Sequence, residues 1–349
     1  MHMSDALLSP AVGGTFWAGT TAAVGWCSRR VGKRIDDRTV PLMGVAAAFV
    51  FAAQMINFSI PGTGSSGHLG GGMILAALLG PHAAFLAMAS VLTVQALFFA
   101  DGGLLALGCN IWNLGVYPCF VAFPFLFRPL ARSGSASRIT LASVASAVGG
   151  LQLGAFSVVL QTLVSGRSEL PFVPFLLMML PIHLAIGLVE GFVTAGVLRY
   201  VGAARPGILG WPKEERARPS RKRILVLLGL LAVLSGGFLS GFASTDPDGL
   251  EWSISRVAGK VGLGETSGGT GEALKHLQEK TAILPDYGFR PKKEPGEETP
   301  SALPPGRSAP DAGTTVSGLV GSGIVLLLTI LVGGTIRRFR KRTSARTPG

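Results

Sequence analysis

Residues 83–100 read AAFLAMASVLTVQALFFA, a run of apolar and small residues without a single charge. An α-helix needs about 20 such residues to cross the hydrocarbon core of a bilayer, so this run is typical of a membrane span. Spanning β-strands would instead show short segments of alternating hydrophobicity. Comparable runs recur along the chain. We expect spans at residues 9–28, 41–58, 69–82, 83–100, 103–127, 139–165, 171–198, 224–243 and 316–336.

The composition indicates the same class of protein. Of the 349 residues, 48% are hydrophobic and only 14% are charged, whereas soluble domains carry about 25% charged residues. The predicted fold is an all-α polytopic membrane protein. We expect a compact bundle of about seven transmembrane helices, followed by two further transmembrane helices that flank an extracytoplasmic loop.

The basic residues predict the orientation in the membrane. If successive spans alternate in direction, four segments share one side, and these segments hold 22 of the 31 Lys and Arg residues. Short loops rich in Lys and Arg remain in the cytoplasm. We therefore expect a multi-pass protein of the cytoplasmic membrane, with its N-terminus outside and its C-terminus in the cytoplasm. The four segments are residues 29–40, 128–138, 199–223 and 337–349.

The net charge of +12 does not by itself indicate a nucleic-acid partner. The basic residues form short runs beside the spans, such as Arg337–Arg342, whereas nucleic-acid binding favours a folded basic patch with aromatic residues. Membrane lipid is the expected contact of these runs, and no nucleic-acid partner is expected.

A polar, basic stretch interrupts the hydrophobic pattern at Trp211–Arg223 and indicates a domain boundary. Beyond it, two spans at 224–243 and 316–336 enclose an external loop at 244–315. Part of that loop, residues 294–314, is rich in Pro, Glu, Ser and Gly and is expected to be disordered. The predicted divisions are a membrane domain at 1–205, a basic cytoplasmic linker at 206–223, a second module at 224–336 and a basic cytoplasmic tail at 337–349.

Met1 and His2 can form a metal chelate. The terminal amine, the backbone nitrogen of His2 and its ring nitrogen close a five- and a six-membered ring around one ion, and square-planar nitrogen coordination favours Ni(II) or Cu(II) over tetrahedral Zn(II). No basic region of a signal peptide precedes the first span, so the mature chain is expected to begin at Met1. His68 is the expected fourth donor, because the topology places it outside in a glycine-rich loop. A histidine at position 2 also arises by chance, so the residues alone leave this site open.

Four polar residues inside predicted spans are candidates for roles in the protein interior. Ionisable residues at membrane depth usually face other helices, and His183 and Glu190 lie seven residues apart on nearly one helix face. They are interpreted either as a relay for an ion or partner contact, or as a buried hydrogen-bonded pair that fixes packing. Asn110 and Asn113 either order the ligand loop or join helices through hydrogen bonds.

Other reactive residue types have simpler interpretations. Cys27, Cys109 and Cys119 lack metal-ligand spacing and are expected to be small buried hydrophobic residues. Asp101 is expected to be a solvated turn residue, and His82 is expected to lie at the cytoplasmic end without binding an ion.

A rival hypothesis comes from the four residues Gly64–Gly67. They match the G-x-S-G of rhomboid-type intramembrane serine proteases, with Ser66 as nucleophile and His183 as base. Four residues are a weak motif, and serines in a loop also serve as turn or capping residues. Both interpretations of Ser66 stay open at this point.

A second motif, Asp248-Gly249-Leu250-Glu251, lies in the external loop. An acidic residue followed three positions later by glutamate is typical of a capping box that starts a short helix. A functional role for this motif is compatible with that prediction.

Several stretches resemble one known family. The opening MHMSDALLSPAVGGT, the loop PGTGSSGHLGGG, the stretch GCNIWNLGVYP and the segment PIHLAIGLVEGFVTA are similar to the nickel/cobalt substrate-binding components of energy-coupling factor transporters, the CbiM/NikM family. The similarity covers about the first 200 residues. The later residues 246–251 resemble the PDGLE signature of the small companion component, fused here through a second pair of spans.

This resemblance implies a function and a ligand set. The chain would be the substrate-specific component of an ATP-driven uptake transporter that captures Ni²⁺ or Co²⁺ outside the cell, with Met1, His2 and His68 as ligands and no organic cofactor. No G-x-x-x-x-G-K-[ST] phosphate loop occurs in the sequence, so we expect a non-enzymatic component that works with a coupling transmembrane subunit and cytoplasmic ATPase subunits. A metal-gated sensor or passive channel is the remaining alternative.

Overall fold

The structure is a computed structural model, which describes residues 2–34, 39–168, 170–204, 221–258, 269–289 and 312–344. Met1, most of the predicted linker at 206–223 and most of the segment at 294–314, for which the sequence predicts disorder, lie outside the described residues.

The described residues are mainly helical. Two short strands, β1 (Phe58–Ile60) and β2 (Ser65–Gly67), form an antiparallel hairpin in which Ser59 pairs with Ser66. Short 3-10 helices occur at Asp5–Leu7, Leu239–Phe242 and Pro285–Tyr287. The longer elements are α1 (Pro10–Arg34), α2 (Thr39–Gln54), α3 (Gly72–Leu79), α4 (Pro81–Phe99), α5 (Leu107–Ile111), a π-helix (Trp112–Phe127), α6 (Arg128–Leu130), α7 (Ala136–Ser165), α8 (Phe172–Ala204), α9 (Arg221–Gly237), α10 (Gly249–Ala258), α11 (Gly269–Thr281) and α12 (Ala312–Ser344).

Six helical stretches among the described residues are long and apolar enough to cross a membrane, which confirms the all-α membrane fold. Helix α2, with 16 residues, is apolar but shorter, and α1, with 25 residues, does not reach the same mean hydropathy. The six stretches are Pro81–Phe99, Leu107–Leu130, Ala136–Ser165, Phe172–Ala203, Lys222–Phe242 and Ala312–Arg340.

The predicted span at 69–82 is wrong. Helix α3 has only 8 residues, which gives a length of about 12 Å, whereas the bilayer core is about 30 Å thick. Glycine sets both of its ends, because Gly71 (φ 76°) and Gly80 (φ 77°) adopt backbone conformations that other residues rarely reach. Pro81 then begins α4.

A short glycine-rich loop, residues 68–71, follows the hairpin and runs into the helix bundle. Gly67, Gly70 and Gly71 are buried. Just beyond the loop, a Cβ on Gly72 would lie 2.7 Å from the carbonyl oxygen of Leu114, so only glycine permits this approach. Irregular backbone at membrane depth is stable only where protein surrounds it. The loop is therefore held inside the bundle rather than exposed at its end.

The last two long helices pack onto the first part of the chain. Helices α9 and α12 both contact α2, and α12 also contacts α1 and α4. Glycine allows close contact here, since a Cβ on Gly44 of α2 would lie 2.7 Å from the Ile330 side chain of α12. The two predicted modules thus share one helix bundle.

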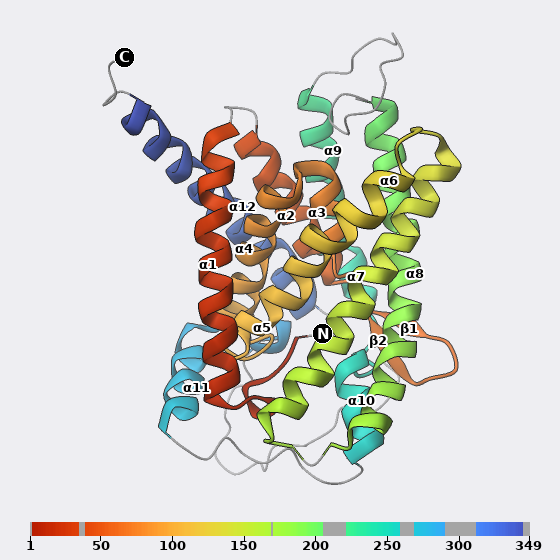
Figure 1. Cartoon of the computed structure of the whole chain (residues 1–349), viewed down its shortest axis with the longest axis vertical. Helices are drawn as coiled ribbons and strands as arrows, with labels where there is room; N and C mark the ends of the chain where they lie inside the picture. Colours follow the sequence, from red (N-terminus) through yellow and green to blue (C-terminus); the bar gives the residue numbers. More distant parts are fainter. Residues whose placement is uncertain are drawn as a thin grey trace.

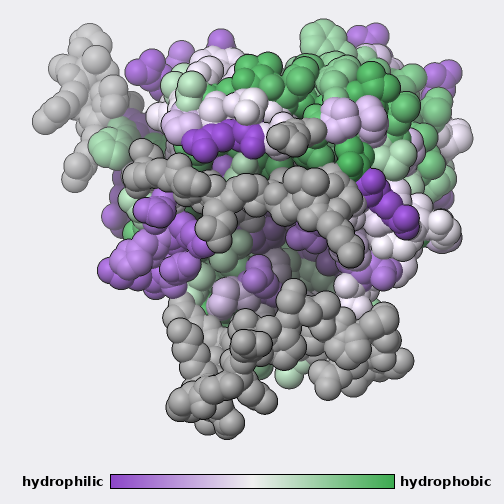
Figure 2. Space-filling view, turned by 90° about the horizontal axis from the view of Figure 1, so that it is seen from below, coloured by the Kyte–Doolittle hydropathy of each residue, from purple (hydrophilic) through white to green (hydrophobic). Residues whose placement is uncertain are grey.

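The ends of the bundle differ in character. The C-terminal end of α1, helix α6, the end of α8, the start of α9 and the end of α12 lie in the upper part of Figure 1, so the described parts of the predicted basic segments lie at one end. The N-terminal residues, α10 and α11 lie in the lower half. Figure 2 views the molecule from this lower side and shows hydrophilic patches next to hydrophobic ones.

Candidate metal centre

The residues before α1 extend into the bundle as an irregular segment. Met3 is fully buried, and the side chain of Asn110 holds its main chain on both sides: Met3 N donates to Asn110 Oδ1 at 2.9 Å, and Asn110 Nδ2 donates to Met3 O at 3.2 Å. Gly103 N also donates to Met3 O at 2.9 Å. These three bonds fix the residue next to the predicted chelate.

His2 and His68 lie side by side. Their ring centroids are 5.2 Å apart with an interplanar angle of 20°. His68 Nδ1 lies 3.1 Å from Leu69 O, and because a carbonyl oxygen only accepts, Nδ1 carries the proton and Nε2 has a lone pair for a metal. The Nε2 atom of His2 is buried without a hydrogen-bond partner. The structure therefore brings together two of the three predicted ligand residues. The third, Met1, lies outside the described residues.

Both imidazoles are neutral in this setting. Burial lowers the pKa of His2 to about 3, and burial together with the neighbouring His2 ring lowers the pKa of His68 to about 4. A neutral imidazole has the lone pair that a transition metal needs. The pair is thus ready for metal at neutral pH without first losing protons.

Buried side chains anchor the glycine-rich loop beyond His68. The Glu190 carboxylate of α8 accepts from Gly70 N at 2.7 Å and from Gly71 N at 3.1 Å. Gln54 Nε2 donates to Gly70 O at 2.9 Å, and Gln95 Nε2 donates to Gln54 Oε1 at 3.0 Å. Both main-chain groups of Gly70 are therefore paired with side chains, from α8 and α2, and Gln95 of α4 holds Gln54 in turn.

Asp101 is not the solvated turn residue that the sequence predicts. Its Oδ1 lies 3.4 Å from His2 Nδ1 with the Asp101 side chain 23% exposed, and Tyr287 Oη donates to its Oδ2 at 2.5 Å. Burial raises the pKa of this carboxyl above its ordinary value. Tyr287 lies 186 positions further along the chain, so no local pattern indicated this contact.

The predicted capping box at the start of α10 is confirmed. Asp248 Oδ1 accepts from Leu250 N at 2.9 Å and from Glu251 N at 2.8 Å, and Glu251 Oε2 accepts from Asp248 N at 3.4 Å. The same segment continues the hairpin, because Ser66 N donates to Pro247 O at 2.8 Å. The motif thus starts a helix and lies directly beside the loop that carries His68.

The protease hypothesis finds no catalytic pair. Ser66 Oγ donates to Asp246 O at 2.8 Å, and His183 Nδ1 is bonded to Met179 O at 2.8 Å. His183 Nε2 has no hydrogen-bond partner, so no serine is aligned with the proposed base. Ser66 is a structural residue that joins the hairpin to the segment before α10.

The remaining predicted interior residues are buried, but they do not pair as expected. The hydrogen-bonded pair of His183 and Glu190 is wrong, since His183 bonds within its own helix and Glu190 bonds to the glycine-rich loop. Asn113 exchanges two hydrogen bonds with Gln161, at 2.9 and 3.1 Å, and so joins the π-helix to α7. Of the two asparagines, Asn110 is the one that bonds to the main chain beside His2.

The predicted burial of the cysteines is confirmed. The three cysteines, at positions 27, 109 and 119, are free and buried. His82 contacts the rings of Trp26 and Phe120, away from His68. Within the described ranges, no three side chains of His, Cys, Asp or Glu come close enough to hold a metal ion. The predicted chelate takes its other donors from the main chain, so it does not need a third side chain.

Sequence reasoning missed two residues of the site, although their polar character inside apolar runs marks them. Gln54 and Gln95 are isolated polar residues inside otherwise apolar runs, and both are buried. Buried polar groups are nearly always hydrogen-bonded, so their presence in spans indicates a partner inside the bundle.

Comparison with known proteins shows the family. The profile of the family described as the cobalt uptake substrate-specific transmembrane region, CbiM, matches residues 2–208. The chain belongs to the CbiM family. Residues 222–338 match the PDGLE domain, so this CbiM-type chain is a fusion of the two.

Relatives of full length support the fusion. The chain is 34% identical to the putative fused nickel transport protein NikMN of Archaeoglobus fulgidus, over 94% of this chain and 96% of that one. It is 31% identical to the fused nickel transport protein NikMN of Rhodobacter capsulatus, over 82% and 88% of the two chains. The crystal structure of a truncated transition metal transporter is similar with a TM-score of 0.50 and 28% identity, covering 58% of this chain and 98% of that one.

Proposed function

We propose that this chain captures Ni²⁺ or Co²⁺ at the extracytoplasmic face, as the substrate-specific component of an ATP-driven uptake transporter of the energy-coupling factor type. One observation carries the proposal: two neutral imidazoles, His2 and His68, face each other inside the bundle, beside the start of the chain. Imidazole nitrogen is a preferred ligand of these metals.

The proposed coordination is planar. The terminal amine of Met1, the backbone nitrogen of His2 and its Nδ1 atom supply three nitrogens, and His68 Nε2 supplies the fourth. In this structure, Nδ1 of His2 lies 3.4 Å from the Asp101 carboxylate. An ion bound to Nδ1 would take the place of the carboxylate. Square-planar nitrogen favours Ni(II), and the fused relatives above are described as nickel transport proteins, so nickel is the expected ion.

The energy source is assigned to partners. The sequence has no phosphate-binding loop, so uphill transport requires cytoplasmic ATPase subunits and a coupling transmembrane subunit. The basic end of the bundle, with α6 and the end of α12, is assigned to the cytoplasm because positive loops remain there. With that orientation, His2 and His68 are assigned to the outer side. Residues 1–205 are proposed as the binding domain and residues 224–336 as its companion.

The experiment is nickel binding by the purified full-length chain in detergent. Wild-type protein is expected to bind one Ni²⁺, and His2→Ala and His68→Ala are each expected to remove high-affinity binding while the helix content stays unchanged. His276→Ala, which removes an exposed imidazole of α11, is the matched control and should bind as wild type. Unchanged nickel affinity in either ligand variant contradicts the proposal.

Transport separates an ATP-driven component from a passive channel. Cells that hold the chain together with its ATPase partners should accumulate nickel, and a variant of the partner that cannot hydrolyse ATP should abolish that uptake. Equal uptake by the chain alone favours the channel.

A further inference from the structure

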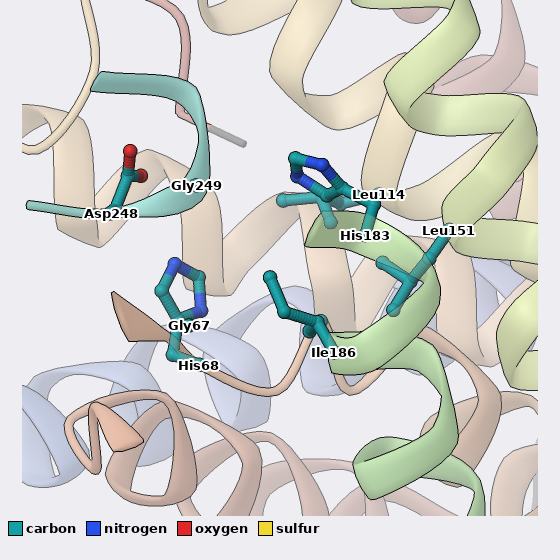
Figure 3. Close-up of a pocket in the computed structure, with 9 residues that line it drawn as sticks. Gly67, His68, Leu114, Leu151, His183, Ile186, Asp248 and Gly249 are labelled. Carbon is teal, nitrogen blue, oxygen red and sulfur yellow. The ribbon is translucent and has the colours of Figure 1, made fainter. Parts of the chain in front are cut away.

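A small cavity adjoins the histidine pair. It has a volume of about 10 Å³ and lies between the glycine-rich loop, α8 and the start of α10. Its walls include His68, His183 and Asp248, and Figure 3 shows these three side chains around one space. A volume of this size holds about one water-sized particle. The cavity therefore has room for one small occupant among three polar side chains.

One wall of the cavity carries a nitrogen without a partner. His183 is 1% exposed, and its Nδ1 lies 2.8 Å from Met179 O. The carbonyl only accepts, so Nδ1 carries the proton and Nε2 has a free lone pair. Nε2 is buried and has no hydrogen-bond partner in the described structure. Buried polar atoms are nearly always satisfied, so this one indicates a missing ligand or water.

The surroundings favour a cation as that ligand. A neutral imidazole nitrogen binds divalent transition metals, and Asp248, on another wall, supplies negative charge. His68 borders this cavity and also stacks on the His2 ring at 5.2 Å. An ion at His183 would thus meet His68 next and His2 after it.

The cavity borders the part of the molecule that the proposed function assigns to the outside. One of its walls is Gly249 at the start of α10, and α10 lies at the lower end of the bundle. Along α8, His183 precedes Glu190, which holds Gly70 and Gly71 beyond His68. His183 is therefore nearer than Gly70 and Gly71 to the end that the proposed function assigns to the outside.

We propose that His183 is an entrance ligand for the transported ion. A divalent transition-metal ion coordinates His183 Nε2 in this cavity, with the Asp248 carboxylate as counter-charge, before it passes to His68 and His2. The proposal rests on the proposed function and assigns a second, transient metal site to it. One imidazole and one carboxylate bind weakly, which suits a site that the ion must leave.

The experiment measures how fast Ni²⁺ loads, in contrast to how tightly it binds. Purified full-length protein is mixed rapidly with NiSO₄, and the absorption of planar nickel is followed. His183→Phe keeps a ring but removes the nitrogen, and Asp248→Asn keeps an oxygen that can accept from Leu250 N and Glu251 N but removes the charge. Both are expected to load about 10- to 100-fold more slowly, the range seen when groups around a metal site are removed, and to reach the same final stoichiometry.

Thr194→Val is the matched control, because Thr194 also lies on α8 with a buried, unpartnered oxygen but does not line the cavity. It should load at the wild-type rate. Wild-type loading rates in His183→Phe and Asp248→Asn would mean that the cavity holds only water, and would overturn the proposal. Loss of final stoichiometry in His183→Phe together with wild-type loading in Asp248→Asn would overturn it as well. If wild-type protein binds no nickel, the proposed function itself fails.

Discussion

At the scale of single residues, the metal centre depends on groups that hold main chain in place. His2 sits directly before Met3, whose N–H and C=O are both bonded to the Asn110 side chain. An amide that binds both main-chain groups acts like a neighbouring β-strand and leaves little freedom to the residue beside it. Asn110 is thus expected to position the chelate without touching the ion.

The two asparagines of the site give a direct comparison. Asn110→Leu removes both bonds to Met3, so we expect nickel affinity to fall about 10- to 100-fold, as for other groups that orient metal ligands. Asn113→Leu removes the two bonds to Gln161 and should lower thermal stability with much less effect on affinity. Isothermal titration and thermal unfolding of both variants test this, and equal affinity losses would contradict it.

The buried imidazoles predict how many protons nickel displaces. The pKa values of about 3 and 4 lie below the ordinary value of a histidine, which is near 6.5, so folding opposes protonation of both rings. The stability this contributes is present above pH 6.5 and is lost as the pH falls towards 4 and 3. Between pH 5 and 7 both rings are neutral, so neither carries the second proton that an imidazolium would release on metal binding.

Nickel binding in that range should release about two protons, one from the terminal amine and one from the His2 backbone nitrogen. Titrations in buffers with different ionisation enthalpies count them. Release of four protons would mean that both imidazoles are charged before nickel binds.

At the scale of elements, the glycine-rich loop determines where His68 lies. Gly71 has φ 76°, and a Cβ there would collide with the Val50 side chain of α2. Gly71→Ala should therefore destabilise the protein by about 2–5 kcal/mol, from backbone strain and overpacking together. Gly196→Ala on α8, where nothing lies within 4 Å, should be neutral or stabilise by up to about 1 kcal/mol. Chemical unfolding of both variants tests this, and similar stabilities would contradict the assigned role of Gly71.

Hydropathy predicts most of the helices but not the loop that bears the ligand. The run at 69–82 is apolar enough to suggest a span, yet it begins as loop buried in the bundle and Gly80 separates the short α3 from α4. Apolar composition indicates burial and does not distinguish burial in lipid from burial in protein. The cluster of Gly70, Gly71 and Gly72 was the available sign that helix was interrupted.

The same limit applies to the residues around the site. Chelate chemistry and topology suggest His2 and His68, and the resemblance to the CbiM/NikM family implies them as ligands. The capping box at Asp248 follows from local spacing. The contact between Tyr287 and Asp101 joins residues 186 positions apart. Such contacts are set by how the helices pack and have no signature in either segment alone.

At the scale of the whole molecule, the PDGLE module packs against the proposed metal centre. Pro247 O accepts from Ser66 N of the hairpin that precedes His68, and the Tyr287 hydroxyl donates to Asp101. Gln278 of α11 adds bonds to Ala96 O and Gly102 O, at 2.9 and 2.7 Å, on either side of Asp101. The module thus contacts both segments that lie beside the histidine pair.

The account depends most on the start of the chain as a ligand. The direct measurement is equilibrium nickel binding by protein with one glycine added before Met1, after its intact mass confirms that the extension is retained. The added residue moves the terminal amine out of the chelate while His2 and His68 remain, so high-affinity binding is predicted to be lost and helix content to be unchanged. Stoichiometric, tight nickel binding by the extended protein would contradict the proposed coordination.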